Sequence, residues 1–333
     1  MSSGAVALIA AIATLGACTA QAPQGAGPGR FSLAYIQKQG DQAYFQDEAA
    51  GARDRAARLG VELSVVDVGT DAQGTLDAVR TAVARGARGV VVAVPDPALG
   101  PQLVRLARES GVELLASDDQ ICADLPDPGV CSHRKLVPRV GFSGQQMGEA
   151  VGARAAQEFA KAGWKAADTR IVTAGRKDIS VCRERIDAAT AAFQRTARVR
   201  TLNVGTDNTV DGARSAVAAT AAAEAGSPRH WVVWGCNDEN VRGALTALRG
   251  NRVAAADVIG VGLGGYLACK DWGSAEPYAM RAALAIRGRE VGALAVQTMY
   301  EKVRNGTPFP QEALAPTVMV DPSTWRAAGA ECG

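Results

Sequence analysis

The sequence predicts an α/β protein in which two doubly wound parallel sheets form two lobes around a central cleft. From residue 31 onward, short runs rich in Val, Ile and Leu alternate with Ala-rich amphipathic stretches. The run 89–94 is almost entirely Val, which is typical of a parallel strand covered on both faces. The alternation restarts after about residue 142, so we expect two similar lobes joined by a hinge. A cleft between two lobes is a common small-molecule site.

The individual elements follow from apolar periodicity and from residues that start or stop helices. In the first half, strands are predicted at 31–37, 61–68, 89–94 and 112–116, with helices between them. Gly60 and Gly86 follow the first two helices, where glycine commonly ends a helix. In the second half, strands are predicted at 170–173, 199–204, 231–234, 258–263, 280–285 and 317–320. Helices are predicted between these strands, with Ser143 capping one, Asp207 opening another and 287–303 forming the last.

Composition excludes several classes of protein. The 333 residues are 47% hydrophobic and 21% charged, as in a soluble globular protein with room for two domains. The formal net charge is +2 and Lys and Arg do not cluster, so nucleic acid is not an expected partner. Two histidines leave little basis for a His-based metal site, and neither a metal nor a cofactor is predicted.

The N-terminal region predicts export. Residues 5–17 carry no charge, and their last three residues form the sequence Leu15-Gly16-Ala17-Cys18 together with the next residue. Such a segment is too short to span a bilayer and indicates a secretion signal. The order Leu, Gly, Ala, Cys resembles a bacterial lipobox, which would make 1–18 the signal and Cys18 a lipidated N-terminus. No Lys or Arg precedes the apolar run, so an Ala-rich unstructured N-terminus is the alternative. Residues 19–30 are predicted to be a flexible tether.

Six cysteines remain when Cys18 is set aside, and none of them forms a C-x-x-C motif. Cys122 and Cys131 flank a loop rich in Pro, Asp and Gly, and we predict a disulfide between them, with two free thiols as the alternative. The pairing of Cys182, Cys236, Cys269 and Cys332 stays open at this point, because connectivity cannot be deduced from sequence.

Polar residues follow several predicted strands. They include Lys38, Asp118-Asp119 and Asn237, and in an open parallel sheet ligands bind beyond the carboxyl ends of the strands. Adjacent strand residues point in opposite directions, so at most one of the two aspartates is expected to face the cleft. Arg185, on a predicted helix, offers a fixed fork of donors for hydroxyls or a ring oxygen. No nucleophile lies beside a base, which favours binding over catalysis.

Two enzymatic alternatives rest on weak motifs. Residues 260–265 spell G-x-G-x-x-G after a predicted strand, but they lie late in the chain and no suitable acid follows, so dinucleotide binding is not favoured. We interpret these glycines as giving a ligand close access to the backbone. Asp118 and Asp119 are neighbours, whereas a glycosidase needs two carboxyls on opposite sides of a bond. The prediction is therefore that the protein is not an enzyme.

Six segments in order resemble the periplasmic L-arabinose-binding protein family, which are sugar-binding proteins of ABC importers. The segments are Lys38-Gln39 with Tyr44-Phe45-Gln46, residues 94–100, Asp118-Asp119-Gln120, Arg183-Glu184-Arg185, Gly235-Cys236-Asn237-Asp238 and residues 259–262. The resemblance implies the two-lobed periplasmic-binding-protein fold, whose lobes exchange chain three times. It maps the N-terminal lobe to 30–142 plus 286–315 and the C-terminal lobe to 143–285 plus 316–333.

The same resemblance implies roles for single residues. Lys38, Asp119, Arg185 and Asn237 would hydrogen-bond a pyranose, with Asp119 at the anomeric hydroxyl and Arg185 on the ring-oxygen side. Tyr44 or Phe45 would cover a ring face, and Asp118 would support a neighbouring cation. The family pattern changes at four positions. Gln42 stands in place of an acid, Cys236 and Phe142 each in place of Met, and Gly264 in place of a cleft Asn.

We therefore predict a periplasmic or otherwise extracytoplasmic solute-binding protein, either secreted or anchored to a membrane through a lipidated Cys18, that passes an aldopyranose to an ABC permease. L-arabinose or a related D-galactose-type sugar is the expected ligand, a chemoreceptor is a further candidate partner, and the protein is expected to be a monomer. Because Gly264 leaves space at one edge of the site, selectivity is expected to shift, with Tyr266 or a water replacing the missing group. Gly264→Asn would then sharpen selectivity, provided that this residue does not need a positive φ. The alternative is a cytoplasmic sugar-responsive regulator of the same fold, but 1–30 lack a basic DNA-binding motif.

Overall fold

The computed structural model describes residue 1 and residues 31–122, 137–176, 178–224, 228–275 and 277–330. The predicted signal, Cys18 and the tether therefore lie outside the described residues, as does Cys131. In the described part, no helix has both the length and the apolar character needed to cross a membrane.

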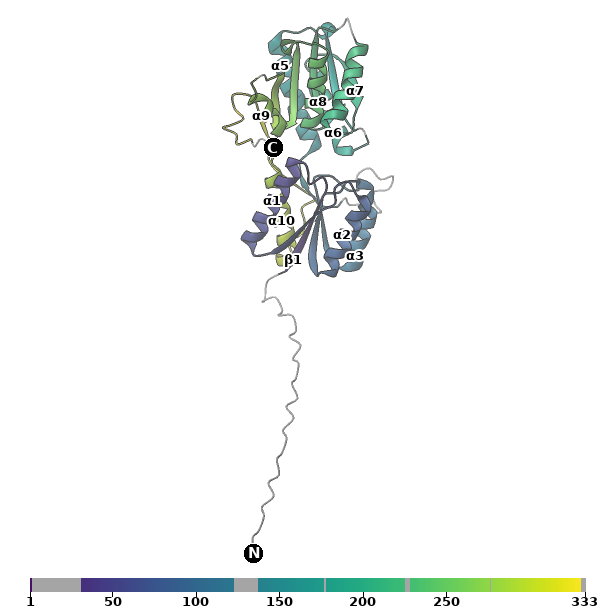
Figure 1. Ribbon diagram of the computed structural model, residues 1–333, viewed down its shortest axis with the longest axis vertical. Helices are drawn as coiled ribbons and strands as arrows, with labels where there is room; N and C mark the ends of the chain where they lie inside the picture. Colours follow the sequence, from purple (N-terminus) through teal and green to yellow (C-terminus); the bar gives the residue numbers. More distant parts are fainter. Residues whose placement is uncertain (2–30, 123–136, 177, 225–227, 276, 331–333) are drawn as a thin grey trace. The chain divides into compact units, whose positions relative to one another are not determined.

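The first sheet has six strands in the order β11-β5-β4-β3-β1-β2, and all of its neighbouring strands run parallel. Its strands are β1 Ser32–Gln37, β2 Glu62–Asp67, β3 Ala87–Val92, β4 Glu113–Ser117, β5 Arg139–Gly141 and β11 Glu312–Leu314. Its helices are α1 Ala43–Leu59, α2 Ala72–Ala84, α3 Gly100–Ser110 and α10 Gly288–Asn305, with a 3-10 turn at Pro97–Leu99. Helices α1 and α10 pack together on one face, while α2 and α3 cover the other (Figure 1).

Strand β1 shows why this sheet has continuous apolar runs in the sequence. Leu33 and Tyr35 belong to the core cluster under α1 and α10. Ala34 and Ile36 point to the opposite face and pack with α2 and α3. Because both faces of the strand are covered, apolar residues occupy successive positions instead of alternating with polar ones.

The second sheet has the order β12-β10-β9-β8-β6-β7. Its strands are β6 Thr169–Gly175, β7 Arg200–Gly205, β8 His230–Gly235, β9 Val258–Gly264, β10 Met280–Ala285 and β12 Val318–Val320. Its helices are α5 Gly144–Ala162, α6 Ser180–Gln194, α7 Val210–Ala223, α8 Asp238–Gly250 and α9 Tyr266–Trp272, with 3-10 turns at Ala166–Asp168 and Ala255–Asp257. The neighbouring strands are parallel except at the edge, where β12 runs antiparallel to β10.

The chain passes between the two sheets three times. It leaves the first sheet after β5, returns to it after β10 with α10 and β11, and enters the second sheet again with β12. The fold is thus α/β with two lobes, as the alternating pattern predicted.

Several helix ends follow the sequence signals. Gly60 ends α1 in the left-handed conformation, with φ of 67°. The Ser143 hydroxyl accepts a hydrogen bond from the Gln146 amide at the start of α5. The expectation that Asp207 opens a helix is wrong by three residues. Helix α7 starts at Val210 with Thr209 as its cap, because Asp207 instead accepts hydrogen bonds from the amide and hydroxyl of Thr209.

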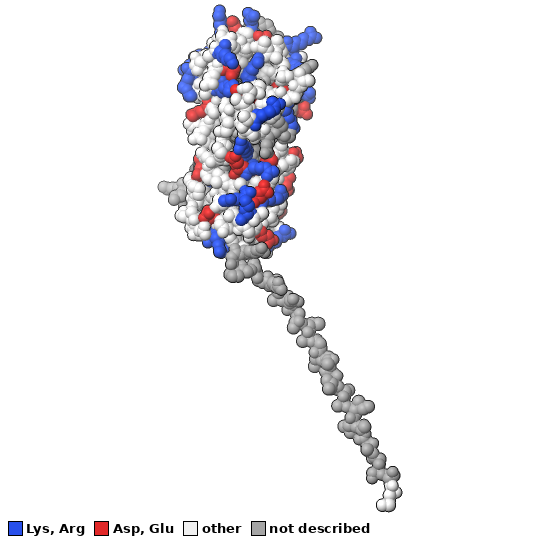
Figure 2. All heavy atoms as spheres, turned by 90° about the vertical axis from the view of Figure 1, so that its left-hand side faces the viewer, with Lys and Arg blue, Asp and Glu red and all other residues white. Residues whose placement is uncertain are grey.

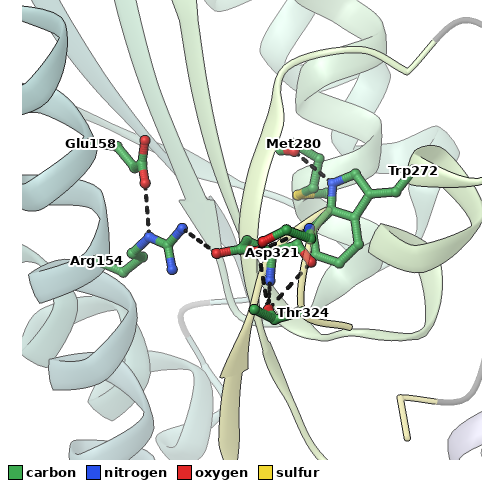
Figure 3. Close-up of polar contacts among 7 residues, drawn as sticks. Arg154, Glu158, Trp272, Met280, Asp321 and Thr324 are labelled. Carbon is green, nitrogen blue, oxygen red and sulfur yellow. Dashed lines mark hydrogen bonds and ion pairs between the residues drawn. The ribbon is translucent and has the colours of Figure 1, made fainter. Parts of the chain in front are cut away.

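The segment after β12 is held against the second lobe. Arg154 on α5 donates to Asp321 at 3.2 Å and to Glu158 at 2.9 Å, as Figure 3 shows. Asp321 also accepts from the Thr324 hydroxyl at 3.1 Å, and hydrogen bonds from Ser323 and Arg154 lower the pKa of this carboxyl. Nearby, the Trp272 indole donates to the Met280 carbonyl at 2.7 Å. The Arg154–Asp321 ion pair thus links the segment after β12 to α5, and the Trp272 hydrogen bond links α9 to β10.

Charged side chains are mixed on the surface. Figure 2 shows basic and acidic side chains together over the face in view, which agrees with a formal net charge of +2.

Candidate functional site

A cavity of about 260 Å³ lies beyond the carboxyl ends of strands from both sheets. Nine residues singled out from the sequence line it: Lys38, Gln42, Tyr44, Phe45, Asp118, Asp119, Arg185, Cys236 and Asn237. The sequence had not indicated several others, among them Thr70, Pro95, Arg176, Cys182, Asn208 and Ile286. Most of these others lie in loops after strands, which carry no periodic signal.

The first-lobe wall of the cavity is built from two adjacent carboxylates. Asp119 forms an ion pair with Lys38, and the Tyr44 hydroxyl donates to Asp118 at 2.7 Å. Both aspartates line the cavity, so the expectation that only one could face it is wrong. Asp118 follows the end of β4 and has a φ of 60°, so the chain turns there instead of continuing the strand alternation. Asp118 therefore accepts a hydrogen bond from the Tyr44 hydroxyl, and the positive charge of Lys38 also acts on its carboxylate.

Arg139 on β5 holds this turn by hydrogen bonds to backbone carbonyls, a role that was not predicted from the sequence. Its guanidinium donates to the carbonyls of Asp118 at 2.5 Å and Phe142 at 2.9 Å. It also pairs with Glu312 on β11 at 2.5 Å. Arg139 thus connects Asp118, whose backbone is in the left-handed conformation, to the edge strand β11.

Behind the first wall lies a buried network of ionisable groups. The Tyr35 and Ser117 hydroxyls both donate to Glu48 on α1. The two hydroxyl oxygens lie 3.0 Å from each other. Burial, followed by the charge of Asp118, raises the pKa of Glu48 well above its ordinary value. Burial and the charge of Asp119 raise the pKa of Asp118, while Lys38 acts in the opposite direction. The first-lobe wall therefore brings together carboxyl groups that can accept hydrogen bonds and whose pKa values are raised.

The second-lobe wall presents a guanidinium. One Arg185 nitrogen, Nη1, donates to the Cys236 carbonyl at 2.9 Å, while the buried Nε has no hydrogen-bond partner among the described residues. Burial lowers the pKa of Arg185, and the negative charges of Asp118 and Asp119 counteract that shift. The guanidinium thus keeps donor capacity for a ligand, and its charge complements the aspartates of the first wall.

Asn237 has its amide partly committed within the protein. It caps α8, where its side-chain oxygen accepts from the Asn240 amide at 3.0 Å, and its nitrogen donates to the Asn208 carbonyl at 3.1 Å. Asn240 in turn donates to the Asn208 side chain at 2.8 Å. These hydrogen bonds fix the orientation of the Asn237 side-chain amide. Contact between Asn237 and a sugar remains a prediction.

The open question of cysteine pairing is partly answered. Cys182 at the start of α6 and Cys236 just after β8 form a disulfide, with their Cα atoms 4.7 Å apart. Cys122 and Cys269 are also disulfide-bonded. The predicted partner of Cys122, Cys131, lies outside the described residues, so that pairing stays a prediction.

Two predicted site residues are not among those that line this cavity. Phe142 is 2% exposed and its ring centroid lies 6.5 Å from that of Tyr44, so it supports Tyr44 from the core. Gly264 lines a neighbouring cavity of about 290 Å³, which shares Tyr44, Tyr266 and Ile286 with the first. A Cβ on Gly264 would lie 2.5 Å from the Tyr266 ring, so the aromatic ring fills the space expected to be open there.

Two glycines of the run, Gly260 and Gly262, pack against protein, whereas Gly264 and Gly265 line the neighbouring cavity. A Cβ on Gly260 would lie 2.9 Å from Leu245, and one on Gly262 would lie 2.6 Å from Asp238 Oδ1. Asp238 is fully buried, and its other oxygen accepts from the Leu267 amide at 2.9 Å. Burial raises the pKa of Asp238 to about 7. The glycines therefore make room for α8 and its first carboxylate.

The arrangement suits a neutral ligand rich in hydroxyls. Carboxylates accept on one wall and a guanidinium donates on the other, and a hydroxyl can do both. Within the described ranges, no three His, Cys, Asp or Glu side chains gather in a way that could hold a metal ion.

Comparison with known proteins identifies the class. The model of the periplasmic binding protein domain matches residues 33–307, and the chain belongs to this family. It is 28% identical to the ABC transporter L-arabinose-binding periplasmic protein of Azospirillum brasilense over 331 residues, covering 98% of this chain and 94% of that protein. It is 29% identical to the L-arabinose-binding periplasmic protein of Escherichia coli strain K12 over 251 residues, which is 73% of each.

Solved structures share the fold at low identity. The arabinose ABC transporter binding protein of Shewanella sp. ANA-3, bound to L-arabinofuranose, matches with a TM-score of 0.75 and 14% identity, covering 89% of this chain and 94% of that one. A solute-binding protein of Actinobacillus succinogenes with bound D-allose also has a TM-score of 0.75, with 16% identity, covering 89% and 99%. These likenesses establish the two-lobed architecture.

Proposed function

We propose that this protein is the extracytoplasmic solute-binding protein of an ABC sugar importer, and that it binds an aldopyranose in the cavity between its lobes. The observation that carries the proposal is the pairing of walls, with Asp118 and Asp119 opposite Arg185 across one cavity. A pyranose offers hydroxyls to the carboxylates and oxygens to the guanidinium. The names of the two relatives support a sugar ligand.

L-arabinose or a D-galactose-type sugar is the ligand we propose. The cavity of about 260 Å³ is near the small end of ligand pockets, which suits a monosaccharide. Tyr44 and Phe45 form an edge-on pair with centroids 5.1 Å apart, and both line the cavity, so a ring there can cover an apolar sugar face. Asp119 would take the anomeric hydroxyl and Arg185 the ring-oxygen side.

Transport follows from closure of the two lobes, which we divide into 30–142 plus 286–315 and 143–285 plus 316–333. A sugar that contacts both walls stabilises the closed form, and a membrane permease then receives it. We propose that a lipidated Cys18 holds the protein at the membrane, that it acts as a monomer without enzymatic activity, and that a chemoreceptor is a further candidate partner.

A thermal-shift screen tests ligand identity, because a ligand that binds only the folded state raises apparent stability. The panel should contain L-arabinose, D-galactose, D-fucose, D-ribose, D-glucose and D-allose, with calorimetry on each hit. We expect the first three to give the largest shifts. A flat response to the whole panel would contradict the proposal.

Cell fractionation tests location. We expect the protein in exported or membrane fractions, and loss of membrane association after Cys18→Ser. A purely cytosolic pool would instead favour the sugar-responsive regulator of the same fold.

A further inference from the structure

The Cys182–Cys236 disulfide lies in the wall of the proposed sugar cavity. Both cysteines line that cavity. Their exposed fractions are only 1% and 3%. The bond joins two elements that are 54 residues apart in sequence, the first turn of α6 and the residue that follows β8. It is therefore a covalent link inside the site and not a surface staple.

Each end of this link is next to a residue that the site needs. Arg185 lies three positions after Cys182, about one turn further along α6. Asn237 directly follows Cys236 and caps α8. The disulfide thus connects the backbone that carries the guanidinium with the backbone that carries the amide.

Polar contacts around the sulfurs reinforce this frame. Arg185 Nη1 donates to the Cys236 carbonyl at 2.9 Å and lies 4.0 Å from the Cys236 sulfur. The Asn208 amide donates to the Cys182 sulfur at 3.4 Å, while the Asn208 carbonyl accepts from Asn237 at 3.1 Å. Movement of either cysteine would therefore displace both the guanidinium and the amide.

We propose that the Cys182–Cys236 disulfide is a positioning element for sugar recognition, which holds Arg185 against the Asn237 turn so that reduction weakens binding. The inference rests on the proposed function. A preorganised donor loses less conformational entropy when the ligand binds. When the disulfide is reduced, Arg185 is less restrained before binding, so its ordering costs more free energy on binding and the affinity falls.

Reduction of the disulfide requires an external two-electron reductant, and we choose dithiothreitol as the probe. One of its thiolates attacks a sulfur of the disulfide to form a mixed disulfide, and its second thiolate then displaces the protein sulfur. The protein gains two thiols and two electrons, and the dithiol leaves as a cyclic disulfide. Because both cysteines are buried and line the cavity, a bound sugar should block the attack.

The main experiment measures sugar affinity by calorimetry for oxidised protein, for protein held in dithiothreitol, and for the Cys182→Ser/Cys236→Ser double variant. Reduction is expected to weaken binding on the order of 10-fold. The double variant should bind like the reduced protein and should not respond to dithiothreitol. That insensitivity is the matched control, since Cys122 and Cys269 are disulfide-bonded as well.

A role that runs through Arg185 can be separated from a merely structural one. In an Arg185→Lys background, which keeps a cation but loses the fork, reduction should weaken binding clearly less than in the wild type. Saturating sugar should also slow alkylation of Cys182 and Cys236 in dithiothreitol, as measured by peptide mapping. A structural bond outside the site would show neither effect.

Equal affinity of the folded oxidised and reduced proteins would overturn the proposal, as would a double variant that still weakens in dithiothreitol. If the double variant does not fold, the test is the comparison of oxidised with reduced wild type. Circular dichroism then shows whether the reduced wild type is folded, so that a loss of affinity is not a loss of structure. If the oxidised protein binds no sugar of the panel, the proposed function itself fails and this inference fails with it.

Discussion

The two walls of the cavity differ in what they present and in how they are held. The first-lobe wall presents Asp118 and Asp119, and it stands on hydrogen bonds among Tyr35, Glu48 and Ser117. The second-lobe wall presents Arg185, and it is held by a disulfide and by side-chain amides. The first wall accepts hydrogen bonds and is supported by a buried network that contains the titratable Glu48. The second wall donates hydrogen bonds and is supported by the Cys182–Cys236 disulfide.

This difference indicates that each lobe should respond to a different perturbation. Replacing a buried acid should disturb the first lobe, whereas cutting the disulfide should disturb the second. The buried Asp238 is the exception, because it puts a titrating group directly beneath the second wall. Substitutions at Glu48, Asp238, Arg185 and Gly264 can show how far the two walls are independent.

The largest expected effect comes from the acid behind the first wall. Glu48→Ala removes the acceptor of the Tyr35 and Ser117 hydroxyls and leaves a cavity. We expect a loss of about 3–4 kcal/mol in the free energy of unfolding, measured in urea. Glu48→Gln is the matched control, since it keeps the shape and an acceptor and should cost clearly less. An alanine variant as stable as the wild type would show that the network does not support the wall.

The second prediction concerns pH and the exception in the second lobe. The pKa of Asp238 is raised to about 7 in the folded protein, so the folded state holds this proton more tightly than the unfolded chain does. Its stabilising contribution is therefore complete below the unfolded pKa and is lost as pH rises through about 7. Relative to Asp238→Asn, the wild type should lose about 2–3 kcal/mol of unfolding free energy between about pH 5 and about pH 8.

Urea unfolding of both proteins across that range provides the measurement. The difference between the two curves matters, because other carboxyls cancel in it. Parallel curves would mean that Asp238 does not hold its proton in the folded state.

The third prediction removes the guanidinium from the second wall. Arg185→Ala should weaken sugar binding by about 1–3 kcal/mol, because ligand oxygens lose a charged donor. The fold should stay intact, and Arg183→Ala, an exposed position on the same helix, serves as the control. Calorimetry that finds near-native affinity for the Arg185 variant would place the sugar elsewhere.

The smallest expected effect tests Gly264. Its φ of 140° is unfavourable for a side chain, and the Tyr266 ring occupies the position of a Cβ. The condition under which Gly264→Asn would sharpen selectivity is therefore not met. We now expect the variant to lose about 1–2 kcal/mol of stability without gaining preference for L-arabinose.

Gly205→Asn is the matched control, since Gly205 ends a strand of the same sheet, has no positive φ and has open space around it. Thermal unfolding of both variants with and without sugars gives the comparison. Unchanged stability together with a sharper sugar ranking would restore the original expectation for Gly264.

Much of the second wall was visible in the sequence, because its signals are local. Arg185 follows a predicted helix start, and Asn237 follows an apolar run, so each is placed by the element on which it lies. The same holds for Lys38 after β1 and for Gly60, whose left-handed conformation is common at the end of a helix. The core strands were found for the same reason, since burial on both faces leaves a continuous apolar run.

The parts that were missed depend on neighbours distant in sequence. Strands β5 and β11 have only three residues each, too few to show a period. They form because β5 pairs with β4 and β11 pairs with β5. Glu48 resembles a solvated helix residue, although its position between Phe45 and Ala52 on one helix face was a usable signal of burial.

By itself, the sequence determined the order of most strands and helices, the class of fold and the chemical character of most residues around the cavity, because periodicity and strand ends are properties of neighbouring residues. Only the tertiary structure decided that Cys182 pairs with Cys236, that Asp118 turns to join Asp119 in the cavity, and that Tyr266 fills the space beside Gly264. Each of these depends on which residues, distant in the sequence, come into contact in the folded chain, and a local sequence pattern does not contain that information.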